Sequence, residues 1–332
     1  MSERDREIRK PFLLRPTGKD YLWGGKRLND EFAKNIDMSP LAETWECSTH
    51  PDGLSYIVGG KMDGCSLSEA ICSHPELLGT HPLTDGELPV LIKFIDANQN
   101  LSVQVHPGDE YAARVENGQS GKTEMWYVLD ASKDAHLIYG LNTDVTEEEL
   151  RQSIEAGSIG KYLQKIPVEK NDVFFLEPGT IHAIGAGTLV AEIQENSDLT
   201  YRLYDYDRVD KNGNKRELHI DKAMEVANLK SSARPKQPLR VLKYKPGVAS
   251  ELLGRCKYFE VYRRIINTER RQEVWFKADE LSFRVLLCVN GCGVMSYEDE
   301  SVNIYKGDCF FIPADSVDIR LHGRMQLLDV RG

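Results

Sequence analysis

Four polar residues in three segments of the chain have the chemistry and the setting of a metal site. Gln104 and His106 lie two positions apart in the apolar segment LSVQVHP, so a strand here would direct both side chains to one face. Glu124 opens the apolar run EMWYVLD, and His182 follows the Pro-Gly turn of EPGTIHAIG. Two imidazoles, a carboxylate and a carboxamide suit Zn²⁺ with one coordination position left open, and they also suit Fe²⁺ or Mn²⁺.

The same residues also have a plain structural interpretation. A histidine on a strand is more often structural than a ligand, and spacing alone does not separate a metal site from polar residues at strand ends. His50, His74 and His81 each precede a proline, and we interpret them as loop residues. No role is predicted for His136, His219 and His322.

The segments that carry the candidate ligands are typical of short strands, because apolar runs alternate with turn residues. Five strands are expected in this part of the chain, at residues 88–96, 101–105, 124–130, 172–178 and 188–194. Beyond about residue 237, runs such as LRVLKYK, LSFRVLLCV and CFFIP continue the pattern with few helical signals. The last third of the chain is therefore predicted to be all β.

A few helices are expected on this β framework. Capping boxes, in which a Ser or Thr is followed three residues later by Glu, begin at Ser66 and at Thr146. A further segment, HIDKAMEVANL, has apolar residues at helical spacing. The predicted helical segments are inserts at about 66–82 and 144–166 and a third helix at 219–229.

One internal repeat indicates two β units of one type. KNDVFFLEPGTIH (170–182) and KGDCFFIPADSVD (306–318) share a Lys, a turn residue, an Asp, a short apolar strand, a Pro and a loop. This repeat predicts two β-barrels in tandem. The second copy has Val317 or Asp318 where the first has His182, so the second unit is predicted to bind no metal.

The composition indicates a folded protein with about two domains. The chain has 332 residues, of which 41% are hydrophobic and 28% charged, and these values argue against disorder, collagen-like sequence and coiled coil. We expect a catalytic domain over 1–236, which contains the helical inserts, and a second, metal-free domain over 237–332.

Charge and cysteine content exclude several classes of partner. Lys and Arg total 42 against 52 Asp and Glu, and the net charge of −10 argues against nucleic acid. No stretch approaches 18 apolar residues, and MSERDREIRKPF lacks the apolar core of a signal peptide, so we expect a cytoplasmic protein without a membrane partner. The seven cysteines include no CxxC pair, and we expect free thiols.

Four motifs in order give the chain a specific resemblance to a known family. LSVQVHP, GKTEMWY, PGTIHAI and AEIQENSDLTYRLYDYDR resemble segments of the type I mannose-6-phosphate isomerases, and YLWGG near the start fits as well. The short second domain and the YRLYDYDR run resemble the compact bacterial branch of that family. The resemblance covers essentially the whole chain. It implies a cupin fold, one Zn²⁺ per chain and interconversion of mannose 6-phosphate with fructose 6-phosphate.

The resemblance also implies which residues bind the metal. His106, Glu124 and His182 match the ligands of the family. Gln104 matches a fourth ligand of the longer members, a position at which the compact branch varies.

Matched positions imply the catalytic set as well. Arg202 matches the active-site arginine of the family, and Glu192 and Lys122 match a carboxylate and a lysine of the same site. Ser102 matches a serine associated with the substrate phosphate. The longer members follow their arginine with a Gly-Leu-Thr-Pro-Lys type segment, whereas this chain has LYDYDR. The phosphate and hydroxyl contacts of that segment are therefore not carried over.

Elementary chemistry limits what these side chains can do. Moving a proton between C2 and C1 of a hexose phosphate requires stabilisation of an enediolate. Arg202 stays protonated at neutral pH, so we expect it to act electrostatically. We expect Lys122 either to exchange protons with a lowered pKa or to stay charged and bind phosphate. Glu192 is expected either to carry the proton or to orient a metal ligand.

Three further residues are candidates for substrate contacts. Trp23 and Trp45 lie near polar loops, where an aromatic face can stack on a sugar, although core packing is expected for at least one of them. Lys93 would face inward if its strand alternates, which makes it a candidate phosphate contact. The charged segment 205–217 is interpreted as a solvated loop that leaves the barrel.

Two alternatives remain open from the residues themselves. Two histidines and a carboxylate on a β-barrel also fit an Fe²⁺ oxygenase of the cupin type. A sugar-binding cupin without turnover is the non-enzyme alternative, but it has no need for the proton-transfer set of Lys122, Glu192 and Arg202. The expected partner is a phosphorylated hexose, and the expected assembly is a monomer or a weak homo-oligomer.

Overall fold

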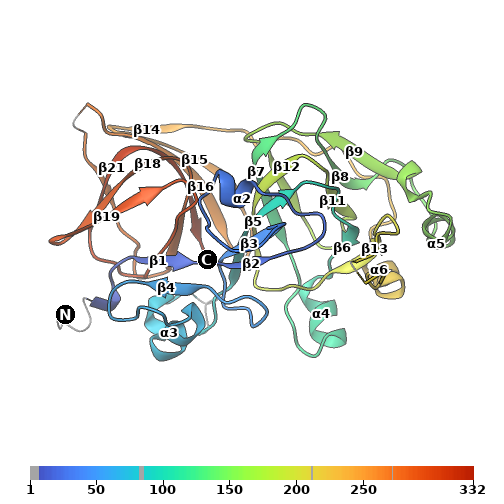
Figure 1. Cartoon of the computed structure of the whole chain (residues 1–332), viewed down its shortest axis with the longest axis horizontal. Coiled ribbons are helices and arrows are strands. Elements are labelled where there is room, and N and C mark those ends of the chain that lie inside the picture. The colour runs from blue at the N-terminus through green and yellow to red at the C-terminus, as the bar shows by residue number, and fades with distance from the viewer. Residues whose placement is uncertain (1–6, 82–85, 211, 271) are drawn as a thin grey trace.

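The computed structural model describes residues 7–81, 86–210, 212–270 and 272–332. The described chain is mainly β, as predicted, and all pairs of named strands are antiparallel. It forms two β units side by side (Figure 1), with the C-terminal unit at the left of the view and the N-terminal unit at the right.

The N-terminal unit is built from two sheets that share an apolar core. The six-stranded sheet has the order β10-β7-β12-β5-β3-β2, and the five-stranded sheet has the order β13-β6-β11-β8-β9. The core between them includes Ile95 and Trp126 from the first sheet and Leu137 and Ile184 from the second. The strands of the first sheet are β2 (Thr17–Lys19), β3 (Glu43–Cys47), β5 (Val90–Ala97), β7 (Glu124–Ala131), β10 (Val173–Leu176) and β12 (Thr188–Glu195). Those of the second are β6 (Val103–Val105), β8 (His136–Leu141), β9 (Leu163–Pro167), β11 (His182–Ile184) and β13 (Tyr201–Tyr204).

The five predicted strands of this unit all form, as β5, β6, β7, β10 and β12. β5 and β12 are buried along their whole length, which is why they appear in the sequence as continuous apolar runs. Along β5, Phe94 packs towards the C-terminal unit, whereas Ile95 packs towards the five-stranded sheet. The six-stranded sheet is therefore the middle layer of the molecule.

The C-terminal unit is all β, as predicted, but it includes strands from the start of the chain. Its ten-stranded sheet contains β1 and β4, and Phe12 of β1 pairs with Phe311 of β20. The strands are β1 (Phe12–Arg15), β4 (Tyr56–Val58), β14 (Lys243–Lys245), β15 (Val248–Arg255), β16 (Glu260–Asn267), β17 (Val274–Phe276), β18 (Arg284–Tyr297), β19 (Glu300–Tyr305), β20 (Cys309–Ile312) and β21 (Ile319–Arg331). The first strands of the chain thus complete the sheet formed by its last third.

The internal repeat corresponds to β10 in the first unit and β20 in the second, and each copy forms the expected short apolar strand. Among the described residues, the group of His, Cys, Asp and Glu side chains close enough to hold one metal ion lies in the first unit. In the second copy, Val317 is largely buried in the apolar core.

The helices are short and lie at the edges of the sheets. Both predicted capping boxes form, at Ser66 and at Thr146. Residues 163–166, the end of the second predicted helical insert, instead belong to strand β9, because this segment pairs with β8. The end of the first insert, residue 82, lies outside the described residues. The helices are α2 (Arg27–Asp30), α3 (Leu67–Ser73), η1 (Pro75–Leu77), α4 (Asp109–Val115), α5 (Glu147–Glu155), η2 (Ile159–Lys161) and α6 (Ile220–Val226).

In the part of the chain that the structure describes, none of the helices has the length and apolar character needed to cross a bilayer.

Candidate active site and metal centre

Three neighbouring strands place a row of polar residues across the five-stranded sheet. Gln104 of β6 is in register with His182 of β11 on one side and with Arg202 of β13 on the other. The flanking residues of β6, Val103 and Val105, are fully buried in an apolar cluster. Since strand side chains alternate between faces, the row of Gln104, His182 and Arg202 points away from that cluster.

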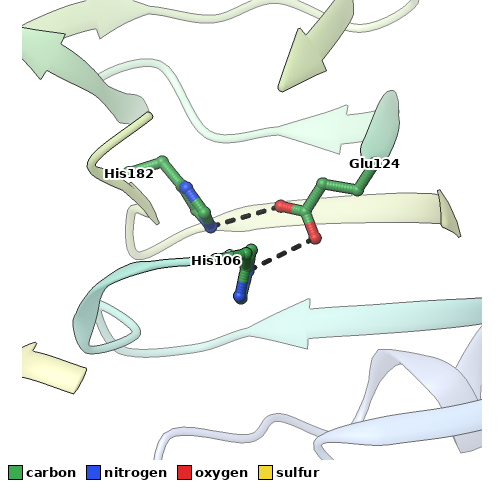
Figure 2. A group of neighbouring side chains, drawn as sticks. All are labelled: His106, Glu124 and His182. Carbon is green, nitrogen blue, oxygen red and sulfur yellow. Dashed lines mark ion pairs between the residues drawn. The ribbon is translucent and has the colours of Figure 1, made fainter. Parts of the chain in front are cut away.

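His106, Glu124 and His182 come together in a buried group (Figure 2). Glu124 Oε1 lies 3.2 Å from His182 Nε2, and Oε2 lies 3.6 Å from His106 Nε2. One potential ligand atom from each residue lies within 4.8 Å of the others. Side chains from three segments distant in sequence therefore converge as the sequence predicted.

Hydrogen bonds fix the two imidazole rings in the orientation that a metal ligand needs. His106 Nδ1 donates to the carbonyl of Leu199 at 2.7 Å, and His182 Nδ1 donates to the carbonyl of Thr180 at 2.8 Å. A carbonyl can only accept, so each Nδ1 carries the proton and each Nε2 presents its lone pair to Glu124. Burial lowers the pKa of His182 to about 4 and that of His106 well below its ordinary value, so both rings are neutral.

Three of the atoms that face one another in this group have no hydrogen-bond partner among the described residues. Among the described residues, none hydrogen-bonds His106 Nε2 or the oxygens of Glu124, although Lys122 Nζ forms an ion pair with Glu124 Oε2 at 3.0 Å. Burial raises the pKa of Glu124 to about 7, although Lys122 opposes the shift. Buried polar atoms without partners cost about 1–3 kcal/mol each. A divalent cation would satisfy all of them, so the donor set fits a metal ion.

Gln104 lies beside this group. Its Nε2 atom is 3.4 Å from His182 Nε2, within the same cluster of polar atoms. Ligation by Gln104 stays a prediction.

A cavity of about 270 Å³ adjoins the three candidate ligands. Its wall includes Gln104 and Lys122, which contact His182 and Glu124 respectively. The predicted site residues that line it are Trp23, Lys93, Ser102, Gln104, Lys122, Glu192 and Arg202. The structure thus gathers the predicted catalytic and substrate-binding residues around one space.

Lys122 and Glu192 form an ion pair in the cavity wall, beside the candidate ligand Glu124. Lys122 Nζ is 3.8 Å from Glu192 Oε1, and Glu192 Oε2 accepts a hydrogen bond from Trp126 Nε1 at 2.7 Å. Burial favours the neutral form of Lys122, but Glu124 and Glu192 outweigh it and raise the pKa. Burial also opposes ionisation of Glu192, but Lys122 and Lys93 outweigh it and lower the pKa. The protein groups therefore keep Lys122 as an ammonium and Glu192 as a carboxylate.

Arg202 is held by the backbone around it. Its Nη1 donates to the Glu217 carbonyl at 2.8 Å, and its Nε donates to Ser102 Oγ at 3.3 Å. The backbone N–H of Arg202 donates to His219 Nδ1 at 3.2 Å, so His219, for which the sequence indicated no role, anchors β13 at the start of α6. Burial and the nearby Arg216 lower the pKa of Arg202, but a guanidinium remains charged at neutral pH.

Of the three further candidates for substrate contacts, Trp23 and Lys93 line the cavity, whereas Trp45 packs in the core. Trp23 lines the cavity and stacks on Tyr21, with ring centroids 5.6 Å apart. Trp45 is fully buried and donates from Nε1 to Glu43 at 2.9 Å, so it packs in the core. Lys93 does face inward, as the alternation of its strand predicted.

Sequence reasoning missed the four other ionisable residues of the cavity wall: Tyr21, Glu43, Asp198 and Arg216. Arg216 belongs to the segment interpreted as a solvated loop. Glu43 lies on β3, two residues before Trp45, and this spacing could have placed both side chains on one face. Asp198 lies between strands, where no periodicity identifies it.

Two family models match the chain. The phosphomannose isomerase type I catalytic domain matches residues 12–134, and the mannose-6-phosphate isomerase cupin domain matches residues 250–331.

Individual proteins are similar over nearly the whole chain. A mannose-6-phosphate isomerase of Bacillus subtilis, ManA, is 38% identical over 95% of this chain and 96% of its own. A mannose-6-phosphate isomerase of Streptococcus mutans is 36% identical over 96% of this chain and 97% of its own. The crystal structure of the mannose 6-phosphate isomerase from Bacillus subtilis superposes with a TM-score of 0.89 at 35% identity, covering 97% of this chain and 99% of that one.

Proposed function

The chain belongs to the type I phosphomannose isomerase family and is a mannose-6-phosphate isomerase, and we propose that it depends on one Zn²⁺ per chain and works by proton transfer through an enediolate. The proposed reaction interconverts mannose 6-phosphate and fructose 6-phosphate. Family membership removes the two alternatives left open by the residues, the iron oxygenase and the sugar-binding cupin without turnover.

The observation that carries the zinc proposal is the buried group of His106, Glu124 and His182. Two neutral imidazoles and a carboxylate face one another, and His106 Nε2 and both Glu124 oxygens have no hydrogen-bond partner among the described residues. We assign these three as ligands and Gln104 as the fourth. When bound, Zn²⁺ supplies Lewis acidity beside the negative charge that develops on the substrate during isomerisation.

Glu192 is the proposed carrier of the proton between C2 and C1. Its Oε2 accepts from Trp126, whereas Oε1 forms ion pairs with the ammonium groups of Lys93 and Lys122, at 3.7 and 3.8 Å. As a carboxylate, Glu192 removes the C2 proton of the open-chain aldose and returns it to C1, while the hydroxyl proton moves from O2 to O1. Such a group contributes about 10²- to 10⁴-fold to the rate.

Arg202 and Lys122 are the proposed electrostatic partners of the enediolate. Both are cationic and line the cavity, and neither has the unprotonated form that a base requires at neutral pH. Fixed positive charge in a site that excludes water stabilises a developing oxyanion more strongly than it would in water.

Metal removal tests this proposal. Purified protein should contain about one zinc per chain and convert mannose 6-phosphate to fructose 6-phosphate. A strong chelator should abolish turnover, and added Zn²⁺ should restore it. Full activity after complete removal of the metal, confirmed by elemental analysis, would overturn the zinc requirement. A parallel panel of hexose 6-phosphates defines the range of substrates.

A further inference from the structure

Arg216 enters the cavity wall from a segment that the sequence presents as a solvated loop. Asp210 closes this segment, because its Oδ1 accepts from the backbone N–H groups of Asn212 and Asn214 at 2.8 and 2.9 Å. Gly213 adopts a φ of +82° in the turn. Val209 and Lys215 then pair as an antiparallel bridge. The chain therefore turns back sharply and delivers the next residue, Arg216, to the cavity.

A buried carboxylate fixes the Arg216 guanidinium in place. Arg216 Nε and Nη2 donate to Asp205 Oδ2 and Oδ1 at 2.8 and 2.6 Å. Burial disfavours ionisation of Asp205, but its hydrogen bonds with Arg216 and Arg208 outweigh burial and lower the pKa. Among the described residues, Nη1 of Arg216 has no hydrogen-bond partner. One edge of the guanidinium is thus tethered, and Nη1 remains available for a ligand.

The positive charge at this part of the wall is less fully offset than the charge elsewhere in the cavity. Lys93 Nζ lies 3.3, 3.7 and 3.9 Å from carboxylates of Asp198, Glu192 and Glu43, so its charge is shared among three acids. Arg216 lies close enough to Arg202 to lower the pKa of that side chain. The Asp205 carboxylate pairs with Arg216 and Arg208, whereas the hydrogen bonds of the Arg202 guanidinium go to Ser102 and to the Glu217 carbonyl, which carry no charge. A doubly charged anion would relieve this repulsion.

The position of Arg216, as a neighbour of Arg202, suits the far end of a hexose phosphate. Arg202 stands beside Gln104, which stands beside His182, so Arg202 is two strands from a candidate metal ligand. Adjacent strands lie about 4.8 Å apart, which places the two main-chain positions roughly 10 Å from each other. A hexose 6-phosphate carries its phosphate at the end opposite to C1 and C2. If C1 and C2 lie at the metal, the phosphate lies at the part of the cavity wall that Arg216 forms.

We propose that Arg216 is the residue that anchors the 6-phosphate of the substrate, with Asp205 as its positioning residue. This assignment rests on the proposed function, since it names the contact through which that site recognises a phosphorylated hexose. Arg216 would then supply a cationic contact in a chain that lacks the Gly-Leu-Thr-Pro-Lys type segment of the longer family members. In this arrangement Arg202 lies between the phosphate held by Arg216 and the reacting carbons, so its charge still acts on the enediolate. The assignment does not require Lys93 to bind the phosphate.

The test is calorimetric binding of sorbitol 6-phosphate, a hexitol phosphate that cannot isomerise, to the full-length zinc-loaded protein. Arg216→Gln should weaken binding by about 10- to 100-fold, the size expected for loss of a charge-assisted contact. Lys215→Gln is the matched control, because it removes the same charge from the neighbouring residue, which pairs with Asp207 at 2.6 Å and does not line the cavity. Its dissociation constant should stay within about twofold of the wild type. For mannose 6-phosphate, Arg216→Gln should raise KM more than it lowers kcat.

The outcomes separate this inference from the proposed function. If Arg216→Gln folds and binds sorbitol 6-phosphate within about threefold of the wild type, the phosphate anchor is wrong even when the wild type isomerises normally. If the wild type binds the hexitol phosphate through Arg216 but does not isomerise mannose 6-phosphate, the proposed function is wrong and the anchor stands. Should Arg216→Gln fail to fold, Arg216→Lys replaces it, because lysine can keep the charge beside Asp205. It should bind about 3- to 10-fold more weakly than the wild type, and unchanged affinity would overturn the anchor.

Discussion

Glu192 and Glu43 are two buried acidic side chains of the cavity wall. Their hydrogen-bond partners are similar, but their pKa values are shifted in opposite directions. Each accepts a hydrogen bond from a tryptophan indole, Glu192 from Trp126 and Glu43 from Trp45. Burial raises the pKa of Glu43, which favours its neutral form, whereas the ammonium groups of Lys122 and Lys93 outweigh burial at Glu192 and lower its pKa. Of the two, Glu192 is therefore the carboxylate able to accept a proton.

The Glu192→Gln variant tests this difference at the scale of one residue. Glutamine keeps the acceptor for Trp126 but cannot take up a proton, so kcat should fall by about 10²- to 10⁴-fold while the zinc content stays unchanged. Glu43→Gln is the matched control, because glutamine resembles the neutral form of Glu43, and it should lower kcat by less than about tenfold. Near-normal kcat in Glu192→Gln would exclude Glu192 as the proton carrier.

The sequence identified side chains that lie on strands better than those that reach the site from loops. Gln104 and Lys93 were identifiable because alternation along a strand fixes which face each one occupies, whereas Glu192 was identified through the resemblance to the family. Arg216 was missed because a charged, turn-rich segment has no periodicity, and only the turn closed by Asp210 returns it to the cavity.

At the scale of elements, the loop that carries Lys122 is held by two carboxyl groups. Glu195, at the end of β12, accepts from the Thr123 backbone N–H at 2.6 Å, and Asp109, at the start of α4, accepts from the Gly121 N–H at 3.0 Å. The two carboxyl side chains also hydrogen-bond each other. Tyr258, from the loop between β15 and β16, donates to Asp109 at 2.5 Å, so the C-terminal unit supports this loop.

This arrangement predicts a pH dependence of stability. Burial, with a contribution from Asp109, raises the pKa of Glu195 to about 7. Because the unfolded side chain loses its proton near its ordinary pKa, the protonated native form contributes stability below about pH 4.5, and the contribution is lost as pH rises through 7. Between pH 5 and 8, the unfolding free energy of the wild type should fall by about 2 to 3 kcal/mol relative to Glu195→Gln.

Urea denaturation at several pH values measures this effect. The groups that face Glu195 are Asp109, Tyr258 and Cys256, and none of them has a pKa shifted into this pH range. Glu155→Gln, at an exposed position on α5, is the control and should keep the slope of the wild type. If Glu195→Gln shows the same slope as the wild type, the neutral form of Glu195 in the native state is refuted.

Helices and strands were predictable where a short sequence pattern, such as a capping box or an apolar run, agreed with the structure that the segment adopts in the folded protein. The capping boxes at Ser66 and Thr146 located α3 and α5, and the apolar runs located β5 and β12. Helix α4 was missed because its N-cap, Gly108, offers no capping side chain and Ala112 is its one buried residue. Local signals also could not indicate that residues 163–166 pair as a strand with β8.

At the scale of the whole molecule, one apolar layer joins the six-stranded sheet to the C-terminal sheet. The layer includes Phe94 and Met125 from the first sheet and Leu253 and Val261 from the second. The sequence repeat indicated two units of one type, but the entry of β1 into the C-terminal sheet has no local signature, because it depends on pairing between the two ends of the chain.

Leu253 and Leu252 are adjacent on β15 and test the importance of this layer. Leu253 is 3% exposed and packs in the layer, whereas Leu252 is 38% exposed. Leu253→Ala should lower the unfolding free energy by about 2 to 5 kcal/mol, since it leaves a cavity in the core. Leu252→Ala should lower it by less than about 1 kcal/mol. Equal effects of the two substitutions in urea denaturation would contradict a close-packed layer between the sheets.

The zinc content of three proteins tests the proposed metal centre most directly. Wild type, His182→Ala and Arg202→Ala should be purified in parallel, exposed to the same Zn²⁺, dialysed and measured by elemental analysis, with circular dichroism as the control for folding. His182 is a proposed ligand, whereas Arg202 lines the same cavity and should act on the substrate. Wild type and Arg202→Ala should hold about one zinc per chain, although Arg202→Ala loses turnover, and His182→Ala should lose both zinc and turnover. A folded His182→Ala protein that keeps a full equivalent of zinc would contradict the metal centre.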